Sequence, residues 1–451
     1  MGNYNVKDYG AVGDSKTTDT AAIQKAIDIC HEKGGGFVIL EDGGFISGTL
    51  YIKSNVWLDV KAGAVLYASG DIKDYGSDTH YNRYVNETDM DRCFLYAKDA
   101  ENIGITGQGI INGNAELFPN EGSIYRPMMI RFLNCRNIHL KGIRLYNAAA
   151  WTTAILDSTQ IWCEDLDICN EKRYNGDGLD FDGCSNIFIS GCRIKGTDDN
   201  LCLQASRKDR PVKNVHITNC NFTSICAGIR IGLKSIGDIN GVVISNCSFD
   251  SVWREGVKIE CTEGGSISNI VMNGLVMHNV TRPLFFLLNN RLERTGSSIG
   301  LEEMPDIGAL ENILVSDVII TDDWEMKNTH YRFKNDIMGS PSFNGIRIDA
   351  EESHPINMVL LKNIVYTFIG GVKLNDIPAE YPKVLDRKIN GTEVSSENYY
   401  PDWSRSAFMD IRNVKNLSLE SIYLKTLNFD ERQPYFLEGC SIQKEDITVL
   451  I

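Results

Sequence analysis

Short runs in which apolar and polar residues alternate recur along this chain at similar distances. The shared pattern is Asn, apolar, any, apolar, any, any, a small or apolar residue, any, apolar. Clear copies occupy residues 186–194, 214–222 and 241–249. Alternation of this kind predicts a strand with one buried face. Weaker copies begin at Asn102, Asn137, Gln160, Asn269, Asn312 and Asn416.

The spacing of these runs predicts a solenoid. From residue 137 to residue 269, successive starts lie 23, 26, 28, 27 and 28 residues apart. Strands that repeat at this period, with Gly and Asn at the corners, favour a parallel β-helix over a β-propeller, whose blades need about 40–50 residues. Stacked coils align like residues into ladders. We expect one such ladder from Cys192, Cys220 and Cys247, and another from the Asn residues at the corners.

Two further features complete the predicted architecture. Residues 20–31 (TAAIQKAIDICH) show helical spacing, with Asp19 or Thr20 as N-cap and Gly34 to Gly36 as the stop, and this helix would cap the solenoid. The sequence therefore predicts one all-β domain over 1–451, with a cap region over 1–36. Loop insertions are expected at about 321–343 and 374–406, where the period breaks.

Composition limits the choice of partners. The formal net charge is −15, from 45 Lys and Arg against 60 Asp and Glu. This balance disfavours nucleic acid and anionic membranes as partners. The sequence shows neither a transmembrane run nor a signal peptide. We expect its thirteen cysteines to have reduced thiols that pack in the core. We expect a cytoplasmic protein, or a secreted one if a leader has been removed, that is a monomer or a small homo-oligomer.

The densest acidic region points to hydrolytic chemistry. Asp177 and Asp199 are 22 residues apart, about one coil, so they are expected on adjacent strands. Asp198 would join them only if its strand bends or ends near Gly196. Nearby carboxyl groups suit glycoside hydrolysis, in which one donates a proton and others activate water. Solvated turn residues or a Ca²⁺ site remain the alternative interpretation.

Specific motifs resemble glycoside hydrolase family 28, the polygalacturonase family of right-handed parallel β-helices. The run NGDG at 175–178 resembles the family's Asn-Thr-Asp motif, and GTDD at 196–199 resembles its Gly-Asp-Asp motif. The opening NVKDYGAVGDSKTTDTAAIQKAI is similar to that of many pectin-active β-helix enzymes, and the ending from Asn428 to Pro434 resembles bacterial exo-acting members. The resemblance covers essentially the whole chain. It implies a pectin-lyase-like, single-stranded, right-handed solenoid.

The resemblance also assigns roles to residues. It implies Asp198 as general acid, with Asp177 and Asp199 holding and deprotonating the water, by single displacement with inversion and without a cofactor or a metal. It implies substrate binding by Asn175, Asp180, Arg230, Lys258 and Glu260.

Two departures from the family pattern affect the expected substrate. The Gly-His-Gly motif falls on Cys226-Ala227-Gly228, so its histidine is replaced by Ala227. The Arg-Ile-Lys motif falls on Lys258-Ile259-Glu260, which reverses the charge of a residue that normally grips a galacturonate carboxylate. Arg230 is a candidate to restore positive charge.

The sequence thus predicts an oligosaccharide hydrolase, with a pectin-derived galacturonide or a rhamnogalacturonan-related bond as substrate and exo action. A neutral-sugar glycan fits Glu260 better. Two other hypotheses stay open. One is a polysaccharide lyase with Lys258 as base, and the other is a β-helix that binds carbohydrate without catalysis.

Overall fold

The computed structural model describes residues 2–79, 92–120, 125–290, 305–323, 345–376, 388–389, 392–393 and 404–450. The chain divides into two compact units, treated separately below. The first unit is Met1–Cys202 with Lys213–Asn221, and the second is Leu203–Val212 with Phe222–Ile451. The predicted insertions at 321–343 and 374–406 lie largely outside the described residues. The single-domain organisation stays a prediction.

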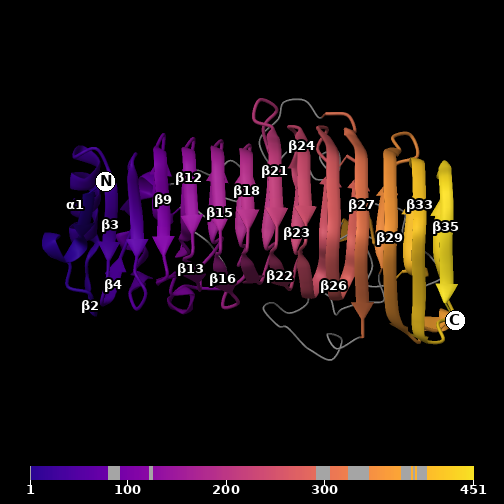
Figure 1. Cartoon of the computed structure of the whole chain (residues 1–451), viewed down its shortest axis with the longest axis horizontal. Coiled ribbons are helices and arrows are strands. Elements are labelled where there is room, and N and C mark those ends of the chain that lie inside the picture. Colours follow the sequence, from indigo (N-terminus) through magenta and orange to yellow (C-terminus); the bar gives the residue numbers. More distant parts are fainter. Residues whose placement is uncertain are drawn as a thin grey trace. The chain divides into compact units, whose positions relative to one another are not determined.

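Parallel strands build the first unit in three rows (Figure 1). One row holds β1 (Gly2–Asn5), β3 (Gly36–Leu40), β6 (Val56–Val60), β9 (Glu101–Gly107), β12 (Arg136–Lys141), β15 (Thr159–Glu164), β18 (Ser185–Ser190) and β21 (Val212–Thr218). A second holds β2 (Asp14–Thr18), β4 (Gly44–Ser47), β7 (Val65–Ala68), β10 (Ile110–Asn112), β13 (Arg144–Tyr146), β16 (Asp167–Asn170) and β19 (Arg193–Gly196). The third holds β5 (Leu50–Tyr51), β8 (Cys93–Lys98), β11 (Met128–Leu133), β14 (Thr153–Leu156) and β17 (Leu179–Asp182).

The second unit continues the same construction with longer strands. Its strands are β23 (Ile229–Ser235), β24 (Ile239–Ser245), β25 (Ser248–Cys261), β26 (Ser266–Leu288), β27 (Ala309–Asp322), β28 (Ile346–Ala350), β29 (Ile356–Gly370), β32 (Ser406–Arg412), β33 (Val414–Asn428), β34 (Gln433–Glu438) and β35 (Ile442–Leu450). An antiparallel pair, β30 (Lys388–Ile389) and β31 (Thr392–Glu393), lies outside the coils. Three strands hold residues of both units: β20 (Leu201–Ala205), β21, whose first residue Val212 belongs to the second unit, and β22 (Asn221–Ser224). The fold is a right-handed parallel β-helix, as predicted.

The repeat starts found in the sequence are corners with left-handed backbone. Asn137 and Asn186 both have φ 54°, and Asn312 in the second unit has φ 58°. Asn adopts this conformation more readily than other residues with a side chain. Asn137 also donates to Asn102 Oδ1 (2.8 Å), so the predicted Asn ladder is present in the first unit. The same residue type therefore satisfies both the backbone and the stacking requirement.

The cysteines are free and mostly buried, as expected. Cys192 and Cys220 lie close together in the first unit, where a hydrogen bond with Cys220 and burial raise the pKa of the Cys192 thiol. Cys247 is buried in the second unit. These thiols fill space in the core.

His216 lies on the outer face of β21 and not in the core. Val215 and Ile217 on either side are fully buried, whereas His216 is exposed on β21. Its ring stacks on Phe188 at 5.4 Å between centroids. Strand alternation turns it outward between two inward apolar residues.

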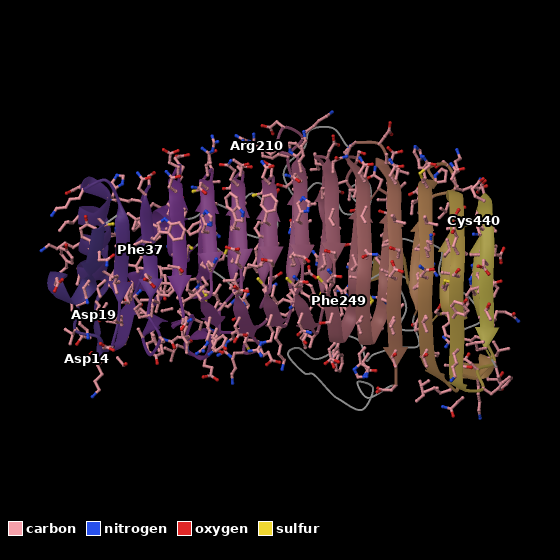
Figure 2. The ribbon with its side chains drawn as sticks, viewed as in Figure 1. Asp14, Asp19, Phe37, Arg210, Phe249 and Cys440 are labelled. Atoms are coloured by element: carbon pink, nitrogen blue, oxygen red, sulfur yellow. The ribbon has the colours of Figure 1, made fainter. Side chains whose placement is uncertain are left out.

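The helix α1 (Thr20–Glu32) forms where the sequence predicts it and buries Ile23, Ala26, Ile27 and Cys30. Asp19, labelled in Figure 2, stands at the N-cap position. Its carboxylate accepts the N–H groups of Val12 (2.7 Å) and Gly13 (3.1 Å) instead of capping the helix. The acid therefore ties the preceding loop to the cap helix. Within the described residues, no helix is long and apolar enough to cross a membrane.

Candidate active site

Two of the predicted catalytic acids lie at one corner of the first unit. The strand β19 ends at Gly196 and β20 begins at Leu201, so Asp198 and Asp199 occupy the turn between them. Because this segment is not a regular strand, the two neighbouring side chains are not forced onto opposite faces. Asp198 Oδ1 accepts the N–H of Asp199 (3.0 Å). The predicted corner near Gly196 therefore holds both Asp198 and Asp199.

Asp177 occupies the matching corner of the preceding coil. Gly178 N–H donates to Asp199 O (3.0 Å), and Gly176 N–H donates to Thr197 Oγ1 (2.9 Å). These bonds join the corner before β17 to the corner before β20. Asp177 is 4% exposed, Asp198 9% and Asp199 1%. Stacking thus brings three carboxyl groups into a largely dehydrated setting, where proton transfer to a bound substrate competes less with water.

A buried arginine controls the orientation of Asn175, which in turn contacts Asp198. Arg126 is 2% exposed and donates to Asn175 Oδ1 (2.9 Å), Tyr174 O (2.5 Å) and Ala149 O (3.2 Å). Because a guanidinium only donates, it holds the oxygen of the Asn175 amide. The amide nitrogen therefore faces Asp198 Oδ2, at 3.4 Å.

Asp180 differs in position from the catalytic acids. It lies within β17, is 4% exposed, and donates its main-chain N–H to Thr153 Oγ1 (2.9 Å). The pairing of Ile155 with Phe181 places Asp180 beside Ala154 of the preceding coil. Its substrate-binding role stays a prediction.

In the second unit, Arg230, Lys258 and Glu260 lie on neighbouring strands. Arg230 of β23 is half-buried and pairs in register with Lys258 of β25. Lys258 and Glu260 are fully buried, and the Lys258 Nζ lies 3.4 Å from Glu260 Oε2 and 3.7 Å from Glu255 Oε2. The charge reversal at residue 260 is therefore balanced within the protein by its own lysine.

Glu255 is the centre of this second cluster and was not recognised from the sequence. It forms a close ion pair with Arg282, whose Nε donates to Glu255 Oε1 at 2.9 Å, and it lies 3.5 Å from Arg254 Nε. Burial alone would raise the pKa of Glu255, but Arg254, Arg282 and Lys258 outweigh it and hold that pKa well below its ordinary value. Ala227, at the position of the family's histidine, is fully buried and supplies no titratable group.

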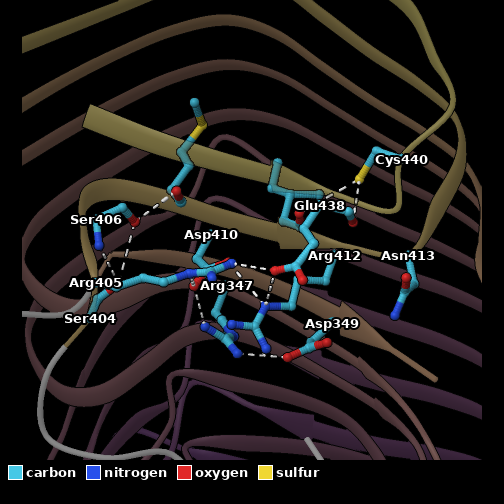
Figure 3. A network of polar contacts seen from close by, with 12 residues as sticks. Arg347, Asp349, Ser404, Arg405, Ser406, Asp410, Arg412, Asn413, Glu438 and Cys440 are labelled. Carbon is cyan, nitrogen blue, oxygen red and sulfur yellow. Dashed lines mark hydrogen bonds and ion pairs between the residues drawn. The ribbon is translucent and has the colours of Figure 1, made fainter. Parts of the chain in front are cut away.

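A separate arginine–aspartate cluster lies nearer the C-terminus of the second unit (Figure 3). Arg347 bridges Asp410 and Asp349, both at 2.7 Å, and Arg405 links Asp410 to Glu438 at 2.8 Å. Burial would raise the pKa of Asp410, but Arg347 and its neighbours lower it below the usual value. These buried ion pairs link β28, β32 and β34.

The sequence therefore predicted that the three acids lie at corners of consecutive coils, but it did not point to Arg126 or Trp151. Arg126 belongs to no recognised motif and lies 49 residues before Asn175. Trp151 is half-buried and ends the segment before β14. Only the period of the coils, counted back from Asp177, could have marked Trp151. In the described part of the first unit, Asp198 and Asp199 offer carboxyl oxygens of the kind that bind a divalent cation.

Comparison with known proteins places this chain among carbohydrate-active enzymes. The model of the family "Glycosyl hydrolases family 28" matches residues 60–293. A probable polygalacturonase from Arabidopsis thaliana is 27% identical over 297 residues, covering 62% of this chain and 59% of that protein. A probable rhamnogalacturonase A from Aspergillus oryzae is 27% identical over 281 residues, covering 61% of this chain and 54% of that protein. The chain thus spans somewhat more than half the length of these curated relatives.

A solved structure supports the fold independently. The family 28 exopolygalacturonase of Yersinia enterocolitica superposes with a TM-score of 0.69 at 18% identity, covering 99% of this chain and 78% of that chain. At this identity the likeness concerns the fold. It confirms the parallel β-helix derived from the repeats.

Proposed function

We propose, from the premise that the chain belongs to glycosyl hydrolases family 28, that it hydrolyses α-glycosidic bonds of pectin-derived oligosaccharides with inversion at the anomeric carbon. The family predicted from the sequence is confirmed by that match. The observation that carries the proposal is the stacking of the Asp177 corner on the Asp198–Asp199 corner. A solenoid without chemistry has no need for buried carboxyl groups at matching positions of consecutive coils.

In the proposed reaction, Asp198 donates its proton to the glycosidic oxygen as the bond from that oxygen to the anomeric carbon breaks. Asp177 and Asp199 hold a water on the opposite face of the sugar and accept its proton as its oxygen bonds to the anomeric carbon. The main-chain N–H of Asp199 donates to Asp198 Oδ1, and the Asn175 amide nitrogen lies 3.4 Å from Oδ2, so the protein positions both oxygens of the proposed acid. Every atom that moves is supplied by substrate, water or these three side chains.

The proposed substrate class rests on the names of the relatives. Relatives named as polygalacturonase and rhamnogalacturonase support an acidic pectic chain or its branched regions as substrate. We propose exo action on short oligosaccharides, as the resemblance of the C-terminal segment to exo-acting members suggested. A cytoplasmic location is proposed with it, and cell fractionation would test that location.

The test is a product screen with one variant and one matched control. The protein is incubated with homogalacturonan, rhamnogalacturonan, their oligosaccharides and nitrophenyl α-glycosides, and products are read by mass and anomeric NMR. Asp198→Asn is expected to lower kcat by about 10²-fold or more, because proton donation is lost. Asp167→Asn, a half-buried aspartate of β16 in the same unit, should leave turnover near normal. Near-normal turnover by Asp198→Asn would remove Asp198 from the acid role.

The environment of Lys258 disfavours the lyase hypothesis. A lyase on this scaffold would need Lys258 as the base that removes a proton from a uronate. In the structure Lys258 is fully buried between Glu255 and Glu260, as in a structural ion pair. An unsaturated product, detected as growing absorbance at about 230 nm, would favour the lyase. Oligosaccharide binding without any turnover would favour a carbohydrate-binding protein.

A further inference from the structure

The turn that carries Asp177 is longer than the turn that carries Asp198 and Asp199. Residues 171–178 connect β16 to β17, whereas residues 197–200 connect β19 to β20 in the following coil. A longer connection has more backbone dihedral angles to fix, so it needs more bonds to hold its end in one orientation. Asp177 lies near the end of the longer turn. The contacts that hold this end therefore decide where its carboxyl group points.

Two buried side chains of the first unit hold the Asp177 end of this turn. Thr152 directly precedes β14 and is fully buried, and Asn170 is the last residue of β16 and is 1% exposed. Thr152 donates twice to the Asp177 carbonyl oxygen, from its main-chain N–H (3.1 Å) and from Oγ1 (2.6 Å). The Asn170 amide nitrogen donates to Thr152 Oγ1, and Asn170 Oδ1 accepts the N–H of Ala148 (2.8 Å). These bonds tie both ends of the turn to the preceding coil.

The direction of each hydrogen bond in this chain of contacts is set by Ala148. A main-chain N–H can only donate, so it holds the oxygen of the Asn170 amide and turns the amide nitrogen toward Thr152. The Thr152 hydroxyl therefore accepts from Asn170 and gives its own proton to the Asp177 carbonyl oxygen. Asn170 thus decides which way the Thr152 hydroxyl points.

The peptide group between Asp177 and Gly178 is held from both sides. Its carbonyl oxygen accepts from Thr152 in the preceding coil, and its N–H donates to the main-chain oxygen of Asp199 (3.0 Å) in the following coil. The peptide group that Thr152 orients is therefore the one that joins Asp177 to Asp199. These are the two acids proposed to hold and deprotonate the attacking water.

We propose that Thr152 and Asn170 are positioning residues for the pair of acids that activates water. Both act through the peptide group of Asp177, which sets the direction of the Asp177 carboxyl group relative to Asp199. A small misplacement of a catalytic group lowers the rate of the chemical step more than it weakens substrate binding. The inference rests on the proposed function and adds two residues to the part of the site that activates water.

The first test compares two buried hydroxyl groups that flank β14. Thr152→Val removes the hydroxyl at nearly unchanged volume, and Thr152→Ser keeps it. Ser158→Ala is the matched control, because Ser158 is 2% exposed and its Oγ likewise accepts a main-chain N–H, from Cys135 (2.9 Å), and donates to a carbonyl oxygen, that of Leu156 (2.7 Å). Thr152→Val and Ser158→Ala should both lower the melting temperature. Only Thr152→Val should lower kcat, by about 10-fold with KM within about 3-fold, and Thr152→Ser should keep kcat within about 3-fold of the parent.

A nitrophenyl glycoside separates the activation of water from the donation of a proton. Its leaving group needs little protonation, so Asp198→Asn should lose less turnover on this substrate than on an oligosaccharide. Water must be activated on both substrates, so Thr152→Val should lose about 10-fold in kcat on each. Asn170→Asp keeps the acceptor for the Ala148 N–H but removes the donor to Thr152. It should show the same pattern as Thr152→Val, and it decides if Thr152→Val does not fold.

Two kinetic results would overturn the inference. One is a kcat of Thr152→Val within about 2-fold of the parent, and the other is an equal loss of kcat in Ser158→Ala. Crystal structures of the parent and of Thr152→Val give a measurement that does not depend on turnover. The Asp177 carboxyl group should be displaced relative to Asp199, and an unchanged arrangement would also overturn the inference. A parent protein that turns over none of the substrates would instead refute the proposed hydrolase, while the two crystal structures still test the positioning.

Discussion

Replacing Arg126 by Met is the sharpest test of how the first unit orients its acid. The change keeps an unbranched side chain of similar length but removes every donor that Arg126 directs at Asn175, Tyr174 and Ala149. Without the guanidinium, the Asn175 amide is free to turn its oxygen toward Asp198. The donor now 3.4 Å from Asp198 Oδ2 is then lost.

The size of the effect follows from the contacts. Leaving a buried acceptor unsatisfied costs about 1–3 kcal/mol, so the three acceptors of Arg126 predict a loss of about 3 kcal/mol or more in the free energy of unfolding. Misorientation of the acid is expected to lower kcat/KM by about 10- to 100-fold, which corresponds to about 1.4–2.7 kcal/mol. A hydrogen bond donated to a carboxylate favours its ionised form. Loss of the Asn175 donor, 3.4 Å from Asp198 Oδ2, should therefore move the alkaline limb of the activity profile upward.

The assay is the pH dependence of kcat/KM, measured with thermal unfolding of the same samples. Arg126→Lys retains one donor for Asn175 and should recover part of the rate and of the parent pH profile. Arg193→Met, in the same unit but on the surface of β19, serves as the control for loss of an arginine. If Arg126→Met keeps the parent pH profile and rate while only its stability falls, Arg126 is a packing residue and the orienting role is refuted.

Other regions give three more predictions. Glu255→Gln should destabilise the protein by about 3–5 kcal/mol, because Arg282 and its neighbours lose their buried counter-charge. Since the folded pKa of Glu255 is lowered, the stability it contributes is complete above its ordinary value of 4.5 and is lost as pH falls below it, so urea titrations of parent and variant should converge in acid. Met358→Asn should stabilise by about 0.5–1 kcal/mol, because Met358 holds φ 56° at a corner where other coils use Asn, and a lower melting temperature would contradict this. Glu260→Lys should shift kcat/KM toward uronate substrates relative to neutral ones, and an unchanged ratio would place residue 260 outside the substrate site.

Much of the fold depends on residues that are close together in the sequence, so it could be predicted. The repeat starts at Asn137, Asn186 and Asn312 are corners with left-handed backbone, which Asn tolerates. The residue type seen in the sequence therefore marks the position of the corner. The coil that the repeat pattern missed begins at Met358, where the conformation is kept but the residue type is not. The helix α1 was predictable because its apolar spacing and its glycine stop are contiguous in sequence.

The sequence by itself therefore determined the strand period, the cap helix and the three acids, since Asp177 and Asp198–Asp199 lie one period apart. The tertiary structure alone decided what surrounds them. Arg126 reaches Asn175 across 49 residues, and Thr152 meets Asp177 only through the register of stacked coils. Likewise, Glu260 alone suggests an uncompensated charge, yet folding buries it against Lys258. Periodicity specifies which residues share a face, whereas charge balance and side-chain orientation depend on neighbours that only the stacking of coils supplies.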